Sequence, residues 1–199
     1  KPDFFQAHLN LGTLLKELGQ LREAEVSTRK AIELNPDFFQ AHLNLGTLLK
    51  ELGQLQEAEA STRKAIELNP DLAQAYSNLG SILKDLGKLK DAEISTRKAI
   101  ELNPDFAEAH SNLGNILRAQ GNLNEAEIST RKAIEIKSDF AEAYSNLGNI
   151  LRAQGNSHEA EISTRKAIEI KPDFAMAHSN LGSILRGQGN LNEAAISTR

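Results

Sequence analysis

The chain has 199 residues, of which 40% are hydrophobic and 25% are charged, a composition typical of folded globular protein. Its net charge of −4 argues against binding to the phosphate backbone of nucleic acids. Cysteine is absent, which excludes disulfides, thiol catalysis and cysteine metal sites, and no apolar run is long enough to span a bilayer. We expect a cytoplasmic protein that binds no nucleic acid and no membrane.

The tripeptide Asn-Leu-Gly recurs six times at a fixed interval of 34 residues, without insertions. A short fixed period indicates units stacked into one elongated array that shares a long core. The interval predicts a single array over residues 1–199, with repeats at 2–35, 36–69, 70–103, 104–137, 138–171 and 172–199, the last truncated. Lys1-Pro2 matches the end of a repeat, so we expect the chain to be part of a longer protein.

The first repeat predicts two helices, over residues 4–18 and 21–34, separated by Gly19 in the position of a left-handed C-cap. Asp3 and Gln6 predict a capping box, and similar pairs precede the second helix of later repeats: Asn122 with Glu125, Asn156 with Glu159, and Asn190 with Glu193. Helical periodicity places an apolar arc of the first helix towards the core: Ala7, His8, Leu11, Gly12, Leu14, Leu15 and Leu18. The opposite arc carries Gln6, Leu9, Asn10, Thr13, Lys16 and Glu17.

The second helix of each repeat has an inner face of Leu21, Ala24, Thr28, Ala31 and Ile32, or their equivalents. Its recurrent Arg-Lys pairs have glutamates at helical spacing, which favours a solvated face of weak ion pairs over a binding patch. Ser157 stands where five repeats have leucine, and a hydroxyl in place of a packed leucine costs about 1–3 kcal/mol. Repeat five is therefore predicted to be the least stable.

These features resemble the tetratricopeptide repeat (TPR) family, whose pattern is matched by His8-x2-Leu11-Gly12-x2-Leu15, then Ala24-x3-Thr28, then Pro36. Histidine or tyrosine, leucine and threonine replace the three aromatic residues of that pattern. The resemblance implies an all-α fold, a right-handed α-solenoid superhelix of about six helix–turn–helix units whose first helices line a concave groove. The stretch Ser-Asn-Leu-Gly-Asn-Ile-Leu also resembles the sequences of bacterial arrays and of the superhelical region of O-linked N-acetylglucosamine transferase. That resemblance implies asparagine ladders that hold extended peptides.

On this basis three rows of side chains should line the groove. The first contains Asn10, Asn44, Asn78, Asn112, Asn146 and Asn180, and the second contains Thr13, Thr47, Ser81, Asn115, Asn149 and Ser183. The third is basic, Lys16, Lys50, Lys84, Arg118, Arg152 and Arg186, and its neighbours change from Glu17, Glu51 and Asp85 to Ala119, Ala153 and Gly187. Beside these rows, Leu9 and Leu43 give way to Ser77, Ser111, Ser145 and Ser179, so the groove should become polar and basic towards its C-terminal end.

The rows predict an interaction scaffold that binds an extended, partly acidic peptide. An amide both donates and accepts, so asparagine can pair with any peptide unit, and arginine pairs with carboxylates or phosphates. The predicted contacts are the six asparagines of the first row with Asn115, Asn149, Lys84, Arg118, Arg152 and Arg186.

Three alternatives remain open. The asparagines could instead bond within the turn or to a neighbouring repeat. The array could be the substrate-recognition arm of a larger glycosyltransferase, sulfotransferase or methyltransferase. It could also associate end to end, because a short last helix should leave Leu181, Ile184 and Leu185 under-covered.

No catalytic constellation is visible. Four of the five histidines, His8, His42, His110 and His178, occupy the aromatic packing place, where a half-buried structural role is expected. No histidine pair or acidic cluster has metal-ligand spacing, and no nucleophile elbow or phosphate loop occurs. We expect no enzymatic activity, no metal and no cofactor.

Overall fold

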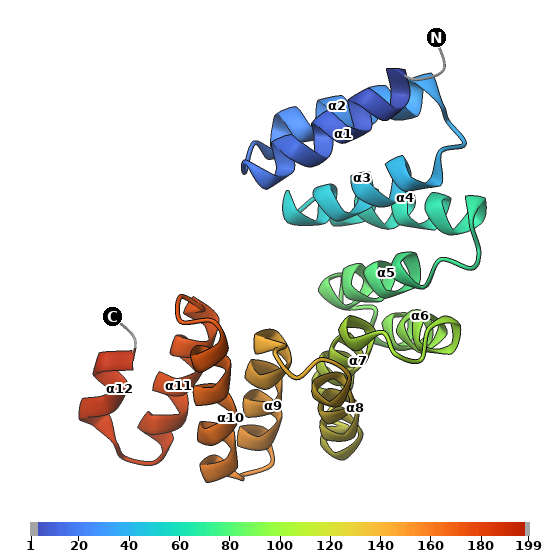
Figure 1. Ribbon diagram of the computed structural model, residues 1–199. Coiled ribbons are helices and arrows are strands. Elements are labelled where there is room, and N and C mark those ends of the chain that lie inside the picture. The colour runs from blue at the N-terminus through green and yellow to red at the C-terminus, as the bar shows by residue number, and fades with distance from the viewer. Residues whose placement is uncertain (1–3, 198–199) are drawn as a thin grey trace. The chain divides into compact units, whose positions relative to one another are not determined.

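The computed structural model describes residues 4–197, which form twelve α-helices and no strand (Figure 1). The helices are α1 (Phe4–Glu17), α2 (Leu21–Leu34), α3 (Phe39–Glu51), α4 (Leu55–Leu68), α5 (Ala73–Asp85), α6 (Leu89–Leu102), α7 (Ala107–Ala119), α8 (Leu123–Ile136), α9 (Ala141–Ala153), α10 (Ser157–Ile170), α11 (Ala175–Gly187) and α12 (Leu191–Ser197). Each odd-numbered helix packs against the even-numbered helix that follows it. The expected all-α solenoid of helical hairpins is confirmed.

The chain divides into two compact units, each of three hairpins. Unit 1 spans Lys1–Pro104 and contains α1–α6, and unit 2 spans Asp105–Arg199 and contains α7–α12. Within each unit the even-numbered helix of one hairpin also contacts the odd-numbered helix of the next. No helix in the described residues is long and apolar enough to cross a membrane.

A glycine ends each odd-numbered helix and lets the chain reverse. Gly19 has a φ of +74°, in the left-handed region that favours glycine. Its N–H donates to the Lys16 carbonyl at 2.9 Å, and the Gln20 N–H donates to the Leu15 carbonyl at 2.9 Å. These two bonds form a Schellman motif, which satisfies carbonyls that the helix end would otherwise leave unpaired. The expected left-handed cap at Gly19 is thus confirmed. The helix itself ends at Glu17, one residue before the predicted end at Leu18.

A second glycine lets the two helices of a hairpin approach closely. A Cβ atom added to Gly12 would lie 2.5 Å from Thr28 Oγ1 and 3.2 Å from the Ala24 carbonyl oxygen. Thr28 is buried, and its hydroxyl donates to the Ala24 carbonyl at 2.8 Å. The threonine that replaces the aromatic residue of the TPR pattern therefore packs directly on the glycine of the facing helix.

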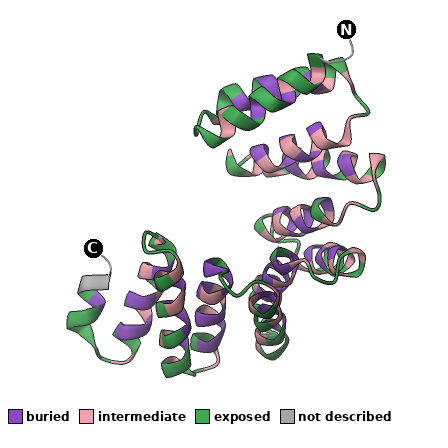
Figure 2. Cartoon of the chain, in the orientation of Figure 1, coloured by how far each residue is buried: buried purple, intermediate pink, exposed green. Residues whose placement is uncertain are grey.

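Buried residues recur along the helices of both units (Figure 2). In unit 1 Leu45 and Leu49 of α3 pack with Ala58 of α4 and with Ile82 of the next hairpin. In unit 2 the same places form an equivalent cluster of Leu147, Leu151, Ala160 and Ile184. Each of these core clusters therefore contains residues of two adjacent hairpins of one unit, as expected for repeats that stack on one another. The four histidines at the aromatic place are half-buried, as expected.

The expected capping boxes are wrong where the structure describes them. α3 begins at Phe39, after Phe38 rather than after Asp37, and neither Asn122 nor Asn156 makes a side-chain cap bond. Asn122 has φ −81° and ψ 63°, outside the extended conformation that directs an N-cap side chain to the helix N–H groups. The amides of Asn122 and Asn190 donate instead to Gln120 at 3.5 Å and Gln188 at 3.4 Å. Asp3 lies outside the described residues.

The expectation that Leu181, Ile184 and Leu185 are under-covered is also wrong. All three are buried, because the short helix α12 packs against α11 through Ala194. Apolar exposure occurs instead on α1, where Leu11 is 47% and Leu14 is 53% exposed. The equivalent leucines of α3 are almost fully buried because the first hairpin covers them.

Candidate functional site

The odd-numbered helices carry the three predicted rows of polar side chains on one side, which we call the A face. In each helix the asparagine is followed three residues later by a small polar residue and six residues later by a base. The base lies in the last helical turn, where positive charge also favours the helix dipole. That benefit is the same in both units, so it does not distinguish them.

In unit 1 the amides of Asn44 and Asn78 use both their oxygen and their nitrogen in hydrogen bonds within the protein. The Asn78 oxygen accepts a hydrogen bond from Gln74 at 2.8 Å, and its amide nitrogen donates to the Thr47 hydroxyl at 2.9 Å. Asn44 makes the same two contacts, with Gln40 at 2.8 Å and Thr13 at 3.4 Å. The exposed Asn10 accepts from Gln6 at 3.0 Å. The asparagine of one helix is therefore tied to the preceding odd-numbered helix.

The bases of unit 1 are also paired. Lys16 forms an ion pair with Glu51 of the next hairpin at 2.8 Å, and Lys50 reaches Asp85 of the next hairpin at 3.5 Å and Ser81 at 2.5 Å. Lys84 pairs with its neighbour Asp85 at 2.6 Å. The acids noted in the sequence thus neutralise the row, and for Lys16 and Lys50 the acid comes from the following repeat.

In unit 2 the asparagine amides bond to a different residue. Asn146 donates to the Ser111 hydroxyl at 2.9 Å, and Asn180 donates to the Ser145 hydroxyl at 2.9 Å. The position that holds glutamine in unit 1 holds Glu142 and Met176 in these helices, and neither donates to the asparagine. The oxygens of Asn146 and Asn180 have no hydrogen-bond donor within the described residues. Asn112 is half-buried on α7.

These serines do not line the surface as the sequence predicted. Ser77, Ser111 and Ser145 are buried, as are Leu9 and Leu43 at the same place, and only Ser179 is exposed. A helical arc computed for one helix misses the burial of Ser111 and Ser145, because the next odd-numbered helix of unit 2 covers each of them. The predicted change from an apolar to a polar groove at these residues is therefore wrong. The serines accept bonds beneath the asparagine row instead.

Four further polar side chains of the A face in unit 2 have no partner within the described residues. Arg118 and Arg152 are exposed and make no ion pair within residues 4–197, because Ala153 and Gly187 stand where unit 1 has acids. Asn115 and Asn149 are half-buried and have no side-chain bond in the same range. Arg186 donates only to Ser183, at 3.2 Å.

Glu108 and Glu142 form ion pairs with lysines and not with the arginines of the basic row. Glu108 pairs with Lys137 at 3.5 Å, and Glu142 approaches Lys171 at 3.8 Å. Both lysines follow the even-numbered helices and also lie over phenylalanine rings. Glu108 and Glu142 lie in the first turns of α7 and α9, whereas Arg118 and Arg152 lie in the last turns, so these acids do not neutralise the arginines.

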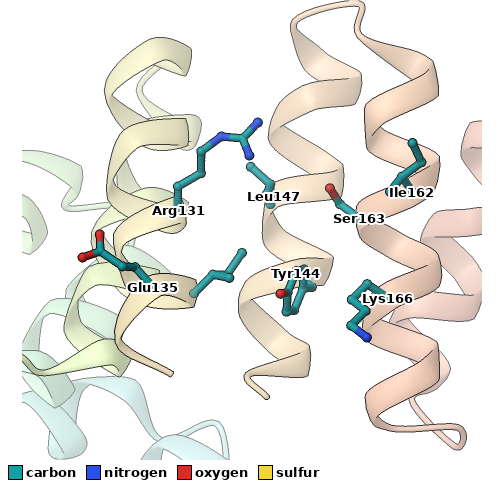
Figure 3. A pocket seen from close by; sticks show the side chains of 8 residues that line it. Arg131, Glu135, Tyr144, Leu147, Ile162, Ser163 and Lys166 are labelled. Carbon is teal, nitrogen blue, oxygen red and sulfur yellow. The ribbon is translucent and has the colours of Figure 1, made fainter. Parts of the chain in front are cut away.

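A pocket that the sequence did not predict lies between α8, α9 and α10 (Figure 3). Its volume is about 490 Å³, and its lining residues are Arg131, Ile134, Glu135, Tyr144, Leu147, Ile162, Ser163 and Lys166. Its two bases are occupied, since Arg131 pairs with Glu127 at 2.9 Å and Lys166 pairs with Glu169 at 2.7 Å.

The ion-pair interpretation of the Arg-Lys positions is confirmed here. A hydrogen bond from Gln154, opposed by partial burial and aided by Arg131, lowers the pKa of the Glu127 carboxyl. The bond to Glu169 raises the pKa of Lys166. Of the exposed isoleucines that recur at one position of the even-numbered helices, Ile94, Ile128 and Ile162, only Ile162 lines this pocket.

Comparison with protein-family models gives matches that together cover residues 5–174. Models described as tetratricopeptide repeat match residues 5–38, 73–106 and 141–174 in one case and residues 28–60 and 96–128 in another. A model described as TPR repeat matches residues 47–87 and 114–155. A comparison with curated protein sequences gives no match.

Several solved structures are similar. A thermophilic TPR protein of Thermus thermophilus has a TM-score of 0.82 at 24% identity, over 92% of this chain and 99% of that protein, and this shows the fold alone. MamA has a TM-score of 0.67 at 26% identity, over 86% of this chain and 94% of that one. YrrB, described as a TPR protein with an unusual peptide-binding site, has a TM-score of 0.61 at 28% identity, over 85% and 88%.

Proposed function

Because the chain belongs to the tetratricopeptide repeat family, we propose that it is a protein-interaction scaffold whose unit 2 binds an extended, acidic segment of a partner protein on its A face. The family and the similar structures support the scaffold. The binding face is supported by one observation, the contrast between paired polar side chains in unit 1 and unpaired ones in unit 2.

The unpaired groups of unit 2 match the requirements of a peptide main chain. The free oxygens of Asn146 and Asn180 accept main-chain N–H groups, and Asn149 both donates and accepts. An unpaired amide on an exposed face is bonded to water in the free protein, so a peptide replaces water rather than a protein contact. In unit 1 the same peptide would have to break bonds that already exist, such as Asn78 to Thr47.

The arginines supply the preference for acidic partners. Arginine binds a carboxylate through two parallel hydrogen bonds, and Arg118 and Arg152 have no internal competitor in the described residues. Support also comes from YrrB, which is described as having a peptide-binding site and shares the fold.

The test compares matched double variants with a fluorescently labelled, aspartate- and glutamate-rich 15-residue peptide as the probe. Arg118→Ala with Arg152→Ala should weaken binding at least fivefold, because two carboxylate contacts are lost. Lys16→Ala with Lys50→Ala, the same change in unit 1, should leave binding within twofold. Equal effects of the two double variants, or no binding to any acidic peptide, would reject the proposal.

We propose end-to-end self-association as a second mode of interaction, with α1 as the exposed apolar end. Leu11 and Leu14 are exposed, whereas the equivalent leucines of α3, Leu45 and Leu48, are buried against the preceding hairpin. Sedimentation velocity should show a concentration-dependent dimer that Leu14→Lys abolishes, and a monomer at all concentrations would contradict it. A single continuous array and a cytoplasmic location remain predictions.

A further inference from the structure

The spacing of Arg118, Arg152 and Arg186 can be compared with the repeat of a bound segment, and the inference drawn from it rests on the proposed function. In unit 2, hydrogen bonds of 2.9 Å join α9 to α7 and α11 to α9, through Asn146 with Ser111 and Asn180 with Ser145. Odd-numbered helices bonded in this way are direct neighbours, and packed helices lie about 8–10 Å apart.

Each of these helices carries one arginine at the same register, Arg118, Arg152 or Arg186. The helix axes that carry these arginines therefore repeat along the face at about 8–10 Å. Asn115 and Asn149 recur at the same interval, so polar donors and acceptors repeat with the charge.

A polyproline II segment has a matching period. It rises about 3.1 Å per residue with three residues per turn, so every third side chain points the same way at intervals of about 9 Å. A β-strand places same-side residues about 6.6 Å or 13 Å apart, which differs from the spacing of the helices that carry the arginines.

An α-helix with acids seven residues apart also repeats at about 10.5 Å, but its main-chain groups are already bonded. A polyproline II segment has no internal hydrogen bonds, so its N–H groups can donate to the Asn146 and Asn180 oxygens, and its N–H and C=O groups can pair with the Asn149 amide.

We propose that unit 2 binds a polyproline II segment that carries aspartate or glutamate at every third position. The carboxylates meet Arg118, Arg152 and Arg186 in turn, and the main chain between them pairs with the asparagines. A protein ligand fits better than a nucleic acid, because the three rows contain no aromatic side chain for base stacking and the chain has a net charge of −4.

The experiment uses the 199-residue chain and three labelled peptides of equal composition, with three glutamates separated by one, two or three other residues and proline among the intervening positions. Fluorescence anisotropy should show the two-residue separation binding roughly five- to tenfold more tightly than the others, since each misplaced carboxylate loses an arginine contact. Replacing the intervening prolines with glycine should weaken binding further, because proline pre-organises the conformation.

Variants separate this inference from the proposal on which it rests. Arg118→Ala with Arg152→Ala should remove the preference for one separation. Equal binding of the three peptides with full dependence on the arginines would overturn the polyproline II inference and leave the peptide proposal standing. Binding that ignores the arginines would overturn both, and arginine-dependent binding of oligo(dT) equal to that of the best peptide would overturn the choice of a protein ligand.

Discussion

The two units share one scaffold but differ in the chemistry of the A face. In unit 1 each lysine has an acidic partner and the Asn44 and Asn78 amides use both donor and acceptor within the protein. In unit 2 Ala153 and Gly187 stand where unit 1 has acids, and the amide nitrogens of Asn146 and Asn180 donate to buried serines. The oxygens of these two asparagines and the guanidinium groups of Arg118 and Arg152 have no partner in the described part of the chain. The comparison teaches that a few substitutions per repeat decide whether a repeated polar row stabilises the fold or remains available to a ligand.

The largest expected effect tests whether the scaffolds are equivalent. Gly46→Val in unit 1 and Gly148→Val in unit 2 should each lower the free energy of unfolding by about 3 kcal/mol, because the new side chain meets the threonine of the facing helix. Gly187→Val is the control, since a Cβ there meets nothing within 4 Å. Chemical denaturation measures all three, and unequal losses for the first two would break the comparison.

The second prediction transfers the neutralisation of unit 1 to unit 2. Ala153→Glu and Gly187→Glu place acids where Glu51 and Asp85 serve Lys16 and Lys50. Affinity for the acidic peptide should fall about tenfold, because the arginines gain internal partners and the face gains negative charge. Ala153→Gln with Gly187→Gln controls for size, and anisotropy titrations that give equal affinities for both double variants would contradict the charge argument.

The third prediction concerns stability within unit 2. Ser157 is half-buried at a place where Leu123 is also half-buried. Ser157→Leu should raise the free energy of unfolding by about 1 kcal/mol through added apolar burial. The reverse exchange, Leu123→Ser, should lower it by a similar amount, and urea denaturation of both variants provides the check. If Ser157→Leu does not raise the free energy of unfolding, the prediction that repeat five is the least stable repeat is wrong.

The fourth prediction separates the two modes of asparagine bonding. Ser145→Ala should cost roughly 0.5–1 kcal/mol because the Asn180 amide loses its acceptor. Thr47→Val is the matched change in unit 1, where Asn78 loses its acceptor. Ser179→Ala, at an exposed serine, should cost almost nothing. Thermal melting measures the shifts, and an effect of Ser179→Ala as large as that of Ser145→Ala would argue against the buried bond.

The smallest expected effect is a dependence on pH that the units share. The pKa of Glu59 is lowered chiefly by its bond to Lys88, and that of Glu127 chiefly by its bond to Gln154, from an ordinary value of 4.5. A lowered pKa in the folded state stabilises the protein above pH 4.5, and this stabilisation is lost as the pH falls through the lowered values. Melting temperatures measured from pH 7 to pH 3 should fall slightly less in Glu127→Gln than in the parent protein.

Much of the fold could be predicted from the sequence because it depends on local rules repeated six times. The second helix of the first repeat begins and ends where its pattern predicts, and Gly19 has the backbone conformation that its position requires. The prediction of capping boxes was wrong because it assumed an extended backbone before the helix. The backbone at Asn122 is not extended, and its side chain makes no hydrogen bond to the helix N–H groups.

The site was predicted only in part. The sequence by itself determined the asparagine row, the basic row and the loss of acids after Asp85, because each is a residue type at a fixed helical position. Only the tertiary structure decided which atoms of those rows are free. Packing of one odd-numbered helix on the next buries Ser111 and Ser145 and turns the asparagine nitrogens towards them. A helical wheel contains no neighbouring helix, so it cannot show which donors and acceptors that neighbour uses.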